Sequence, residues 1–316
     1  MAQSFVMISR DDIRSAYDRI TPHVRRTPVL AVAGRDLGLG FDVELKLEFL
    51  QVTGTFKPRG AFNTLLVHPE ASSICAASGG NHGIATGYAA GRLGRRARIF
   101  VPEISSPAKV ARIRDTGAEL VIGGARYADA LAACEAFAAE SGAFSVHAYD
   151  SWETIAGQGT VGLEWEEQTR GLDTVLVAAG GGGLVAGIAR WFESRVKVVS
   201  VEPEGSRALQ AALEAGHPID VDVASVAADS LGARNVLSRV HETCKAHLST
   251  ALTVPDADIV EAQKRLWLGA RIAAEPGGAT ALAALVSGAY VPAPGERVGV
   301  LACGANVDLT TLAALA

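Results

Sequence analysis

The segment TVLVAAGGGGL, residues 174–184, joins an apolar β-branched run to four consecutive glycines. The run Thr174–Ala178 predicts a buried strand, and Gly183–Glu193 predicts the helix that follows it. Glycines 180–183 leave no side chain between their amides and an anion, and the dipole of the following helix adds attraction. The segment therefore predicts a strand, a turn and a helix that together bind a phosphate.

Two familiar phosphate motifs do not fit this segment. No Gly-Lys-Ser/Thr follows the glycines, as it would in a P-loop. The spacing also differs from the dinucleotide fingerprint, for which Glu202 is the nearest acidic candidate at the end of the next strand. Close packing of a helix on a strand is the alternative reason for a glycine turn, but four glycines in a row exceed what we expect packing to need.

The alternation of β-branched runs with alanine-rich stretches continues along the chain. Such an order predicts an α/β fold, with parallel sheets that carry helices on both faces. The other predicted strands are Val43–Leu47, Ser73–Ala77, Arg98–Val101, Glu119–Ile122, Val196–Val201 and Val298–Ala302. The other predicted helices are Gly83–Leu93, Ser106–Thr116, Tyr127–Glu140, Ser206–Ala215, Asp256–Ala273 and Gly278–Ser287.

Length and composition narrow the class of protein. A chain of 316 residues exceeds the usual single domain, which favours two lobes or one large α/β domain. A net charge of -5 gives no basic excess for nucleic acid. The longest apolar run, Val175–Ala189, is interrupted by the glycines and is shorter than a membrane span. Residues 1–14 lack the apolar core of a signal peptide, and the four scattered cysteines form no C-x-x-C pair. We therefore expect a cytoplasmic protein without nucleic-acid or membrane partners.

The segment GTFKPRGA, residues 54–61, contains a lysine with unusual surroundings. Lys57 lies beside Phe56 and before Pro58, a residue suited to the first turn of a helix. A positive helix terminus and apolar neighbours both disfavour the charged amine. The neutral amine is the form that makes Schiff bases. An isolated lysine at a helix start is more often an ordinary surface residue, so this segment needs support from others.

The segment SGGNHG, residues 78–83, connects a predicted strand to a predicted helix. A glycine-rich turn before a helix directs backbone N–H groups at an anion. The alternative is a tight turn in which Asn81 and Ser78 cap the helix. His82 could be an acid or a base, although capping or packing is the commoner role of such a histidine. A reactive lysine, an asparagine turn and a phosphate site together match the aldehyde, ring hydroxyl and phosphate of one cofactor, pyridoxal 5'-phosphate.

With these segments in view, the chain resembles the fold-type II pyridoxal-phosphate enzymes, which are two-lobed and similar to the tryptophan synthase beta subunit. Within them it resembles the serine/threonine dehydratase and serine racemase group, from about Ile13 to Leu312. The remaining matching stretches are KLEFLQ at 46–51, AGQGT at 156–160, EPGG at 275–278 and CGANVD at 303–308.

The resemblance implies a role for each motif residue. Lys57 would form the Schiff base and act as the base at Cα. Asn81 would bond the ring hydroxyl, and Cys303 would face the pyridine nitrogen as a neutral partner, which favours loss of the β-substituent over transamination. The residues expected to bind the cofactor are Phe56, Lys57, Asn81, Gly180, Gly181, Gly182, Gly183, Leu184, Glu275 and Cys303. The residues expected to bind the substrate carboxylate are Ser78, Gly79, Gly80, Asn81 and His82.

Two departures from the group narrow the expectation. Serine racemases of this type have a second serine where this chain has Gly79, and glycine cannot move a proton, so racemisation is demoted. Of the divalent-cation ligands of the racemases, Glu202 is present but Ala208 replaces an aspartate, so no required metal is expected. The resemblance also implies a small lobe at 50–145, a large lobe formed by 1–49 and 146–316, and a homodimer.

The sequence thus predicts a pyridoxal-phosphate-dependent ammonia-lyase. It would dehydrate a small-molecule substrate, a β-hydroxy amino acid such as threonine, serine or a 3-substituted serine, to a 2-oxo acid and ammonia. A β-replacement enzyme or a racemase of the same fold is the alternative. A non-catalytic amino-acid binder is a further one. The sequence does not specify the β-substituent or the diastereomer.

Overall fold

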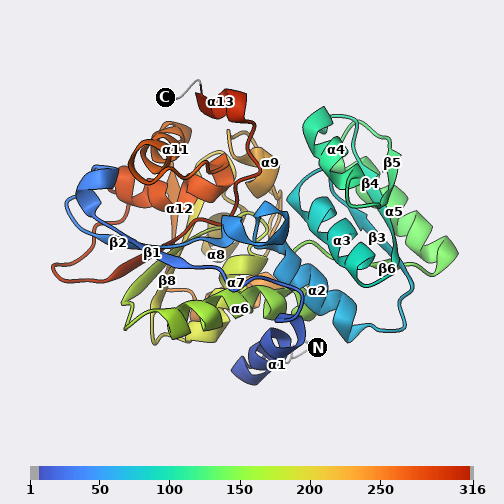
Figure 1. Ribbon diagram of the computed structural model, residues 1–316, viewed down its shortest axis with the longest axis horizontal. Helices are drawn as coiled ribbons and strands as arrows, with labels where there is room; N and C mark the ends of the chain where they lie inside the picture. The colour runs from blue at the N-terminus through green and yellow to red at the C-terminus, as the bar shows by residue number, and fades with distance from the viewer. Residues whose placement is uncertain (1–6, 314–316) are drawn as a thin grey trace.

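The computed structural model describes residues 7–313 and contains two sheets (Figure 1). The larger sheet has six strands in the order β1-β2-β10-β7-β8-β9. All its pairings are parallel except that of β1 with β2 at one edge. Its strands are β1 (Val29–Val32), β2 (Val43–Lys46), β7 (Thr174–Ala178), β8 (Lys197–Pro203), β9 (Thr250–Val254) and β10 (Val298–Leu301).

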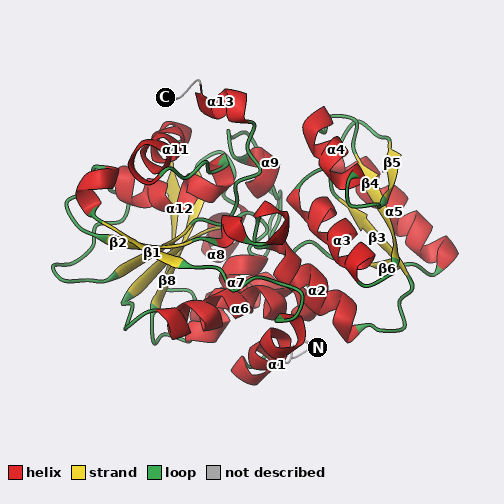
Figure 2. Cartoon of the chain, viewed as in Figure 1, coloured by secondary structure: helices red, strands yellow, loops and turns green. Residues whose placement is uncertain are grey.

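The smaller sheet has four strands in the order β5-β4-β3-β6, all parallel. It lies to the right of the larger sheet in the view of Figure 2, with its own helices around it. Its strands are β3 (Ser73–Ala77), β4 (Arg96–Val101), β5 (Glu119–Ile122) and β6 (Phe144–Ser145).

Helices cover both faces of the larger sheet. In Figure 1, α11 and α12 lie on one side of it, and α6 and α7 lie on the other. The helices are α1 (Arg10–Ile20), α2 (Lys57–Val67), α3 (Asn81–Arg92), α4 (Pro107–Arg114), α5 (Tyr127–Ser141), α6 (Trp152–Gln168), α7 (Gly183–Phe192), α8 (Ala208–Ala215), α9 (Ala228–Leu231), α10 (Ser238–His247), α11 (Asp256–Ala270), α12 (Pro276–Val286) and α13 (Leu309–Ala313). Short 3₁₀ helices are η1 (Gly34–Leu37), η2 (Glu48–Leu50) and η3 (Val52–Gly54).

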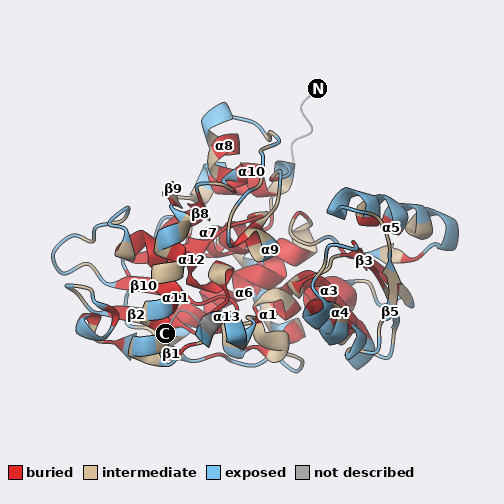
Figure 3. Ribbon diagram, turned by 90° about the horizontal axis from the view of Figure 1, so that it is seen from above, coloured by how far each residue is buried: buried red, intermediate tan, exposed pale blue. Residues whose placement is uncertain are grey.

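The central strands of the larger sheet form the main core. Every residue of β7 and β10 is buried, and the buried ribbon in Figure 3 is concentrated around these strands and α6, α7 and α12. Strands buried on both faces read as continuous apolar runs, which is why the sequence pattern found them. A second apolar cluster, which includes Phe62, Ile74 and Ile99, lies between the smaller sheet and helices α2 and α3.

The predicted α/β class with parallel sheets is confirmed, and all seven predicted strands are present within about two residues of their expected ends. The helix expected to run to Ala273 ends at Ala270, because Arg271 adopts a left-handed conformation with φ +57°. The expected lobe boundaries stay a prediction, and residues 1–6 and 314–316 of the expected large lobe lie outside the described residues. No helix among the described residues has the length and apolarity needed to cross a membrane.

Several elements were not predicted. The edge strand β1, the two-residue β6 and the partly exposed β9 lack a continuous apolar run. Helices α1, α2, α6 and α10 were also missed. In α6 the glycines Gly157, Gly159 and Gly162 lower the local helix propensity. Tertiary packing decides their conformation: a β-carbon on Gly157 would lie 2.6 Å from the carbonyl oxygen of Arg59 in α2.

Candidate active site

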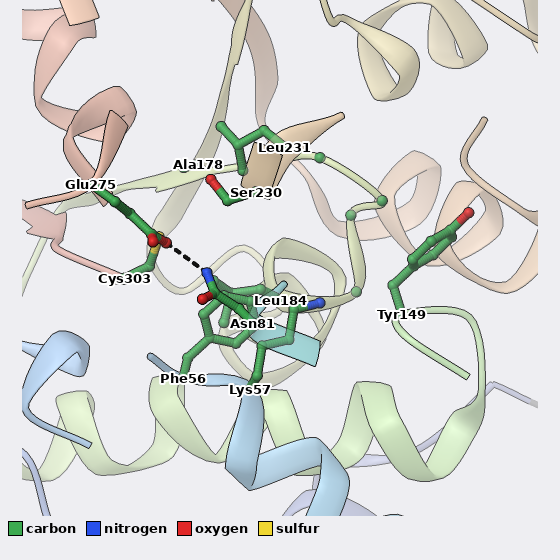
Figure 4. Close-up of a pocket in the computed structure, with 14 residues that line it drawn as sticks. Phe56, Lys57, Asn81, Tyr149, Ala178, Leu184, Ser230, Leu231, Glu275 and Cys303 are labelled. Carbon is green, nitrogen blue, oxygen red and sulfur yellow. Dashed lines mark hydrogen bonds between the residues drawn. The ribbon is translucent and has the colours of Figure 1, made fainter. Parts of the chain in front are cut away.

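One pocket collects residues from segments that are far apart in the sequence (Figure 4). All ten residues expected to bind the cofactor line it. The complete lining is Phe56, Lys57, Asn81, Tyr149, Ala178, Gly180, Gly181, Gly182, Gly183, Leu184, Ser230, Leu231, Glu275 and Cys303. The pocket lies at the carboxyl end of β7, which is where open α/β sheets bind ligands.

Lys57 begins α2 and places its amine in this pocket. The amine donates a hydrogen bond of 3.0 Å to the carbonyl oxygen of Ala148 and lies 5.2 Å from the centre of the Phe56 ring. Burial disfavours the charged form and lowers the pKa of Lys57 to about 8. A sizeable fraction of the amine is therefore neutral near physiological pH, as nucleophilic chemistry requires.

The glycine turn continues directly from β7 into α7, as the sequence predicted. Gly182 is the N-cap of α7 in a left-handed conformation, with φ +81°. The first N–H groups of a helix have no partner within it, and glycines leave them accessible to a phosphate. The turn fits the phosphate of pyridoxal 5'-phosphate, although its phosphate-binding role stays a prediction.

Packing also requires these glycines, contrary to the sequence-based expectation that four exceed what packing needs. A β-carbon on Gly180 would lie 2.7 Å from the Cα atom of Leu231. One on Gly181 would overlap the ring of Tyr149, and one on Gly183 would lie 2.5 Å from the Tyr149 carbonyl oxygen. The glycines therefore admit α9 and the segment around Tyr149, which close over the turn.

Asn81 is held by two residues of distant segments. Its amide nitrogen donates to Glu275 Oε1 at 2.8 Å, and its amide oxygen accepts from Asn306 Nδ2 at 2.7 Å. The asparagine amide has two N–H groups, so one remains for a ligand in the pocket. This orientation fits the ring hydroxyl of the cofactor. Asn306 was not among the predicted site residues, although its motif CGANVD had been recognised.

Glu275 and Cys303 approach the pocket from the side of the larger sheet (Figure 4). Burial raises the pKa of the Glu275 carboxyl, and the Lys109 ammonium acts in the opposite direction. Burial also raises the pKa of the Cys303 thiol, which donates to the carbonyl oxygen of Gly277 at 3.4 Å. A neutral thiol is compatible with the expected uncharged partner of the pyridine nitrogen.

The turn at 78–82 adjoins the pocket through Asn81. The Gly80 N–H donates to Ser78 Oγ at 3.1 Å, so the serine hydroxyl folds back over its own turn. His82 is buried, and its Nε2 lies 2.9 Å from the carbonyl oxygen of Val146. Burial, together with the Lys57 charge, lowers the pKa of His82 to about 3. The imidazole is therefore neutral and serves packing, the commoner of the roles expected from sequence.

Sequence reasoning missed four residues that line the pocket: Tyr149, Ala178, Ser230 and Leu231. Ala178 ends β7, directly before the recognised glycines. The Tyr149 hydroxyl donates to the carbonyl oxygen of Asn235 at 3.0 Å, which fixes its ring beside the glycine turn. Ser230 and Leu231 belong to the four-residue helix α9. Tyr149 and α9 carry no recognisable pattern, because only folding brings them to the glycines.

Glu202 has a different role from that of a metal ligand in this structure. Its buried carboxylate accepts from the backbone N–H groups of Leu209 and Gln210, at 2.8 and 2.7 Å, at the start of α8. Burial raises the pKa of Glu202 to about 8, and the two hydrogen bonds act in the opposite direction. Among the described residues, no cluster of three or more His, Cys, Asp or Glu side chains is arranged to hold a metal ion. Independence from divalent metals stays a prediction.

Comparison with known proteins identifies the family. Residues 20–304 match the family described as "Pyridoxal-phosphate dependent enzyme". The chain belongs to this family. It is 38% identical over 303 residues to phenylserine dehydratase of Ralstonia pickettii, covering 93% of this chain and 92% of that protein. It is 33% identical to L-threonine ammonia-lyase of Geobacter sulfurreducens, covering 95% and 76% of the two chains.

Solved structures agree with the family assignment. A threonine deaminase from the organism abbreviated T.th. superposes with a TM-score of 0.90 at 34% identity, covering 95% of this chain and 99% of that one. Maize serine racemase superposes with a TM-score of 0.91 at 30% identity, covering 98% and 97%. The expected fold type II, the cofactor pyridoxal 5'-phosphate and the activity of an ammonia-lyase that dehydrates β-hydroxy amino acids are confirmed.

Proposed function

We propose that this lyase acts on β-hydroxy amino acids with an uncharged β-substituent: serine, threonine or 3-phenylserine. One observation carries this choice. Among the residues that line the pocket in the described chain, Lys57 is the one cation, and Glu275 contributes a carboxyl group. A substrate that carried a second carboxylate would find no cationic partner there and would lie near an acidic group, an arrangement that is costly at low dielectric.

The nearby lysine does not change this argument. Lys109 is buried and already forms an ion pair with Asp229. Diverting it to a substrate carboxylate would break that pair. The proposal therefore separates this enzyme from relatives such as the beta-hydroxyaspartate dehydratase of Paracoccus denitrificans, to which the chain is 33% identical over 96% of its length.

The site residues have the following proposed roles. Bound pyridoxal 5'-phosphate supplies an electron-withdrawing ring that acidifies the proton on the substrate Cα. Lys57 holds the cofactor, and its amine then takes the Cα proton. Asn81 directs its remaining N–H at the ring hydroxyl. The Cys303 thiol faces the ring nitrogen, and because it is uncharged it does not force that nitrogen to be protonated.

Two turns hold the anionic groups in this proposal. The glycines at 180–183, followed by Leu184, bind the cofactor phosphate at the start of α7. The turn formed by Ser78, Gly79, Gly80, Asn81 and His82 binds the substrate carboxylate at the start of α3. The two turns come from different sheets, so a bound substrate lies between the two sheets.

A substrate panel tests the proposed selectivity. We expect L-serine, L-threonine and one diastereomer of 3-phenylserine to yield equal amounts of 2-oxo acid and ammonia. We expect kcat/KM for 3-hydroxyaspartate to be at least roughly tenfold lower, the scale of one unfavourable charge interaction. A kcat/KM for 3-hydroxyaspartate above the other values would contradict the proposal, as would racemisation faster than formation of oxo acid.

We also propose that the enzyme is a cytoplasmic homodimer with a small lobe at 50–145 and a large lobe formed by 1–49 and 146–316. The family resemblance supports the dimer and the lobes. The cysteines, Cys75, Cys134, Cys244 and Cys303, are free and buried, as is usual in a reducing compartment. Sedimentation of the holoenzyme at micromolar concentration is expected to give twice the mass of the chain, and a monomer would contradict the dimer.

A further inference from the structure

We propose that Ser105 is a substrate-binding residue, whose hydroxyl hydrogen-bonds the substrate carboxylate together with the turn at 78–82. Nothing in the sequence motifs points to this residue. It lies in the loop between β4 and α4, outside all the stretches that carry the family resemblance. The inference rests on the proposed function, because it assumes that the turn at 78–82 receives an amino-acid carboxylate.

The loop of Ser105 and the turn at 78–82 leave the smaller sheet side by side. Strands β3 and β4 are parallel neighbours, with Ala77 opposite Phe100. Beyond this pair, the Ser78 N–H still donates to the Phe100 carbonyl oxygen at 2.9 Å. Both segments therefore emerge at the carboxyl edge of the sheet, where ligands bind in open α/β folds. Asn81, three residues after Ser78, already lines the pocket.

Ser105 fills the space that a side chain at position 79 would occupy. A β-carbon built on Gly79 would overlap the Ser105 hydroxyl oxygen, and it would lie 2.8 Å from the Ser105 Cβ and 3.4 Å from Val101 Cγ1. The turn thus lacks a side chain of its own at 79, and a hydroxyl from the neighbouring loop takes that place. Gly79 is required here because any larger residue would displace Ser105.

The position of Ser105 is not explained by local structure. The helix α4 is capped by the next residue, Ser106, whose hydroxyl accepts from the Lys109 N–H at 3.4 Å. The Ser105 backbone N–H donates to the Pro102 carbonyl oxygen at 3.0 Å, which shapes the loop without using the hydroxyl. Ser105 is only partly buried, so its hydroxyl is accessible to a ligand.

The chemistry of a hydroxyl suits a carboxylate. A serine O–H donates to an ionised oxygen through a short, charge-assisted hydrogen bond. The turn also lies close to the opposite side of the pocket, because a β-carbon on Gly80 would lie 3.6 Å from the Asp229 carbonyl oxygen in α9. A carboxylate at the turn is thus enclosed between α9 and the loop of Ser105, and the hydroxyl adds a donor on the side where Gly79 offers none.

The first test compares Ser105→Ala with Ser106→Ala in the holoenzyme. We expect Ser105→Ala to raise KM for L-serine or L-threonine on the order of tenfold, as for the loss of one hydrogen bond to a charged group. The cofactor absorbance and thermal midpoint should stay unchanged. Ser106→Ala removes a helix cap, so it should lower the thermal midpoint and leave KM within about twofold. A Ser105→Ala enzyme with unchanged KM would overturn the proposal.

The second test moves the hydroxyl from one loop to the other. Gly79→Ser alone should lower kcat/KM strongly, because its side chain collides with Ser105. The double variant Gly79→Ser with Ser105→Gly frees the space and restores a hydroxyl there, so much of the lost kcat/KM should return. A double variant no better than Gly79→Ser, with normal cofactor absorbance, would overturn the proposal.

A third measurement separates this proposal from the proposed function. Binding of L-serine or L-threonine to the holoenzyme can be followed by the change in cofactor absorbance, without turnover. If the wild-type enzyme forms no oxo acid, the proposed function fails. Weaker amino-acid binding by Ser105→Ala in this titration would still support the role of Ser105, and equal binding would overturn it.

Discussion

At the scale of single residues, the chemistry of Lys57 depends on its burial. The pKa of its amine is lowered from about 10.5 to about 8 because the charged form is desolvated. Reconstitution of apoenzyme with pyridoxal 5'-phosphate needs the neutral amine, whose fraction rises with pH through the pKa. We therefore expect the rate of reconstitution, followed by cofactor absorbance, to rise with pH to a plateau with a midpoint near 8.

The control for this measurement is Lys57→Ala, which should show no lysine-dependent absorbance at any pH. Its activity should fall by a factor of about 10³ or more, since one amine both holds the cofactor and moves the Cα proton. A midpoint above about pH 10, near the ordinary lysine value, would show that the amine is solvated in the apoenzyme. Full activity of Lys57→Ala would remove it from the site.

Asn306 is a positioning residue for Asn81. It donates to the Asn81 amide oxygen at 2.7 Å and to the Thr53 carbonyl oxygen at 3.1 Å. Without it the Asn81 amide is free to rotate, and its remaining N–H no longer points steadily into the pocket. We expect Asn306→Ala to shift the absorbance maximum of the bound cofactor and to weaken cofactor binding by roughly 5–30-fold.

The matched control for Asn306 is Asn235→Ala. The Asn235 side chain bonds Asp220 at the surface, at 2.7 Å, and its backbone carbonyl, which holds Tyr149, is kept in the variant. This control should leave the absorbance and the cofactor affinity unchanged. An unaltered spectrum in Asn306→Ala would show that Glu275 alone orients Asn81.

At the scale of elements, glycines decide how closely the helices of the larger sheet approach. A β-carbon on Gly159 in α6 would lie 2.9 Å from the Gly187 carbonyl oxygen in α7 and 2.8 Å from Ile13 Cδ1 in α1. Three helices thus meet at one glycine. We expect Gly159→Ala to lower the free energy of unfolding by about 1–3 kcal/mol through overpacking.

Urea unfolding measures this effect, with Gly40→Ala as the control. A β-carbon on Gly40 meets no atom within 4 Å, and its φ is not in the left-handed region. The control should therefore change stability by less than about 0.5 kcal/mol. Equal stability of the two variants would mean that α6 and α7 can separate without loss.

At the scale of the whole molecule, a buried ion cluster joins the helix of Lys57 to the larger sheet. Arg59 of α2 forms ion pairs with Glu48 and Glu164, at 2.7 and 3.1 Å, and Glu164 also pairs with Lys46 of β2 at 2.6 Å. All four side chains are at most 1% exposed. Removing one member of a buried network leaves an unpaired charge, at a cost of about 3–5 kcal/mol.

The cluster also makes stability depend on acid. Burial alone would raise the pKa of Glu48, but the charge of Arg59 outweighs it and holds the pKa below its ordinary value. A carboxyl with a lowered pKa stabilises the fold above its unfolded pKa, about 4.3, and the stabilisation is lost as pH falls through the folded value. We expect the urea midpoint to decrease as the pH falls below about 4.5.

Glu48→Gln checks the origin of this effect. The variant should be less stable at neutral pH by about 3–5 kcal/mol, and its midpoint should depend less on pH in the acid range, since the titrating group is absent. A variant with the wild-type acid profile would assign the effect to other carboxyl groups.

The sequence predicted the fold and most of the site because these features are local. Buried strands such as β7 are continuous apolar runs, and the glycine turn directly follows one. The residues of the Lys57 and Asn81 motifs are adjacent in sequence, so their pattern is readable without the fold. The missed helix α6 is glycine-rich, and its helical state depends on α2 and α7 packing closely on it.

By itself the sequence determined the α/β class, the cofactor, the reactive lysine and the glycine turn, since each follows from neighbouring residues and their periodicity. Only the tertiary structure decided that Asn306 orients Asn81, that Tyr149 and α9 require the glycines, and that Ser105 fills the place beside Gly79. These contacts join segments far apart along the chain. Their geometry depends on how the sheets and helices pack, and no local pattern encodes it.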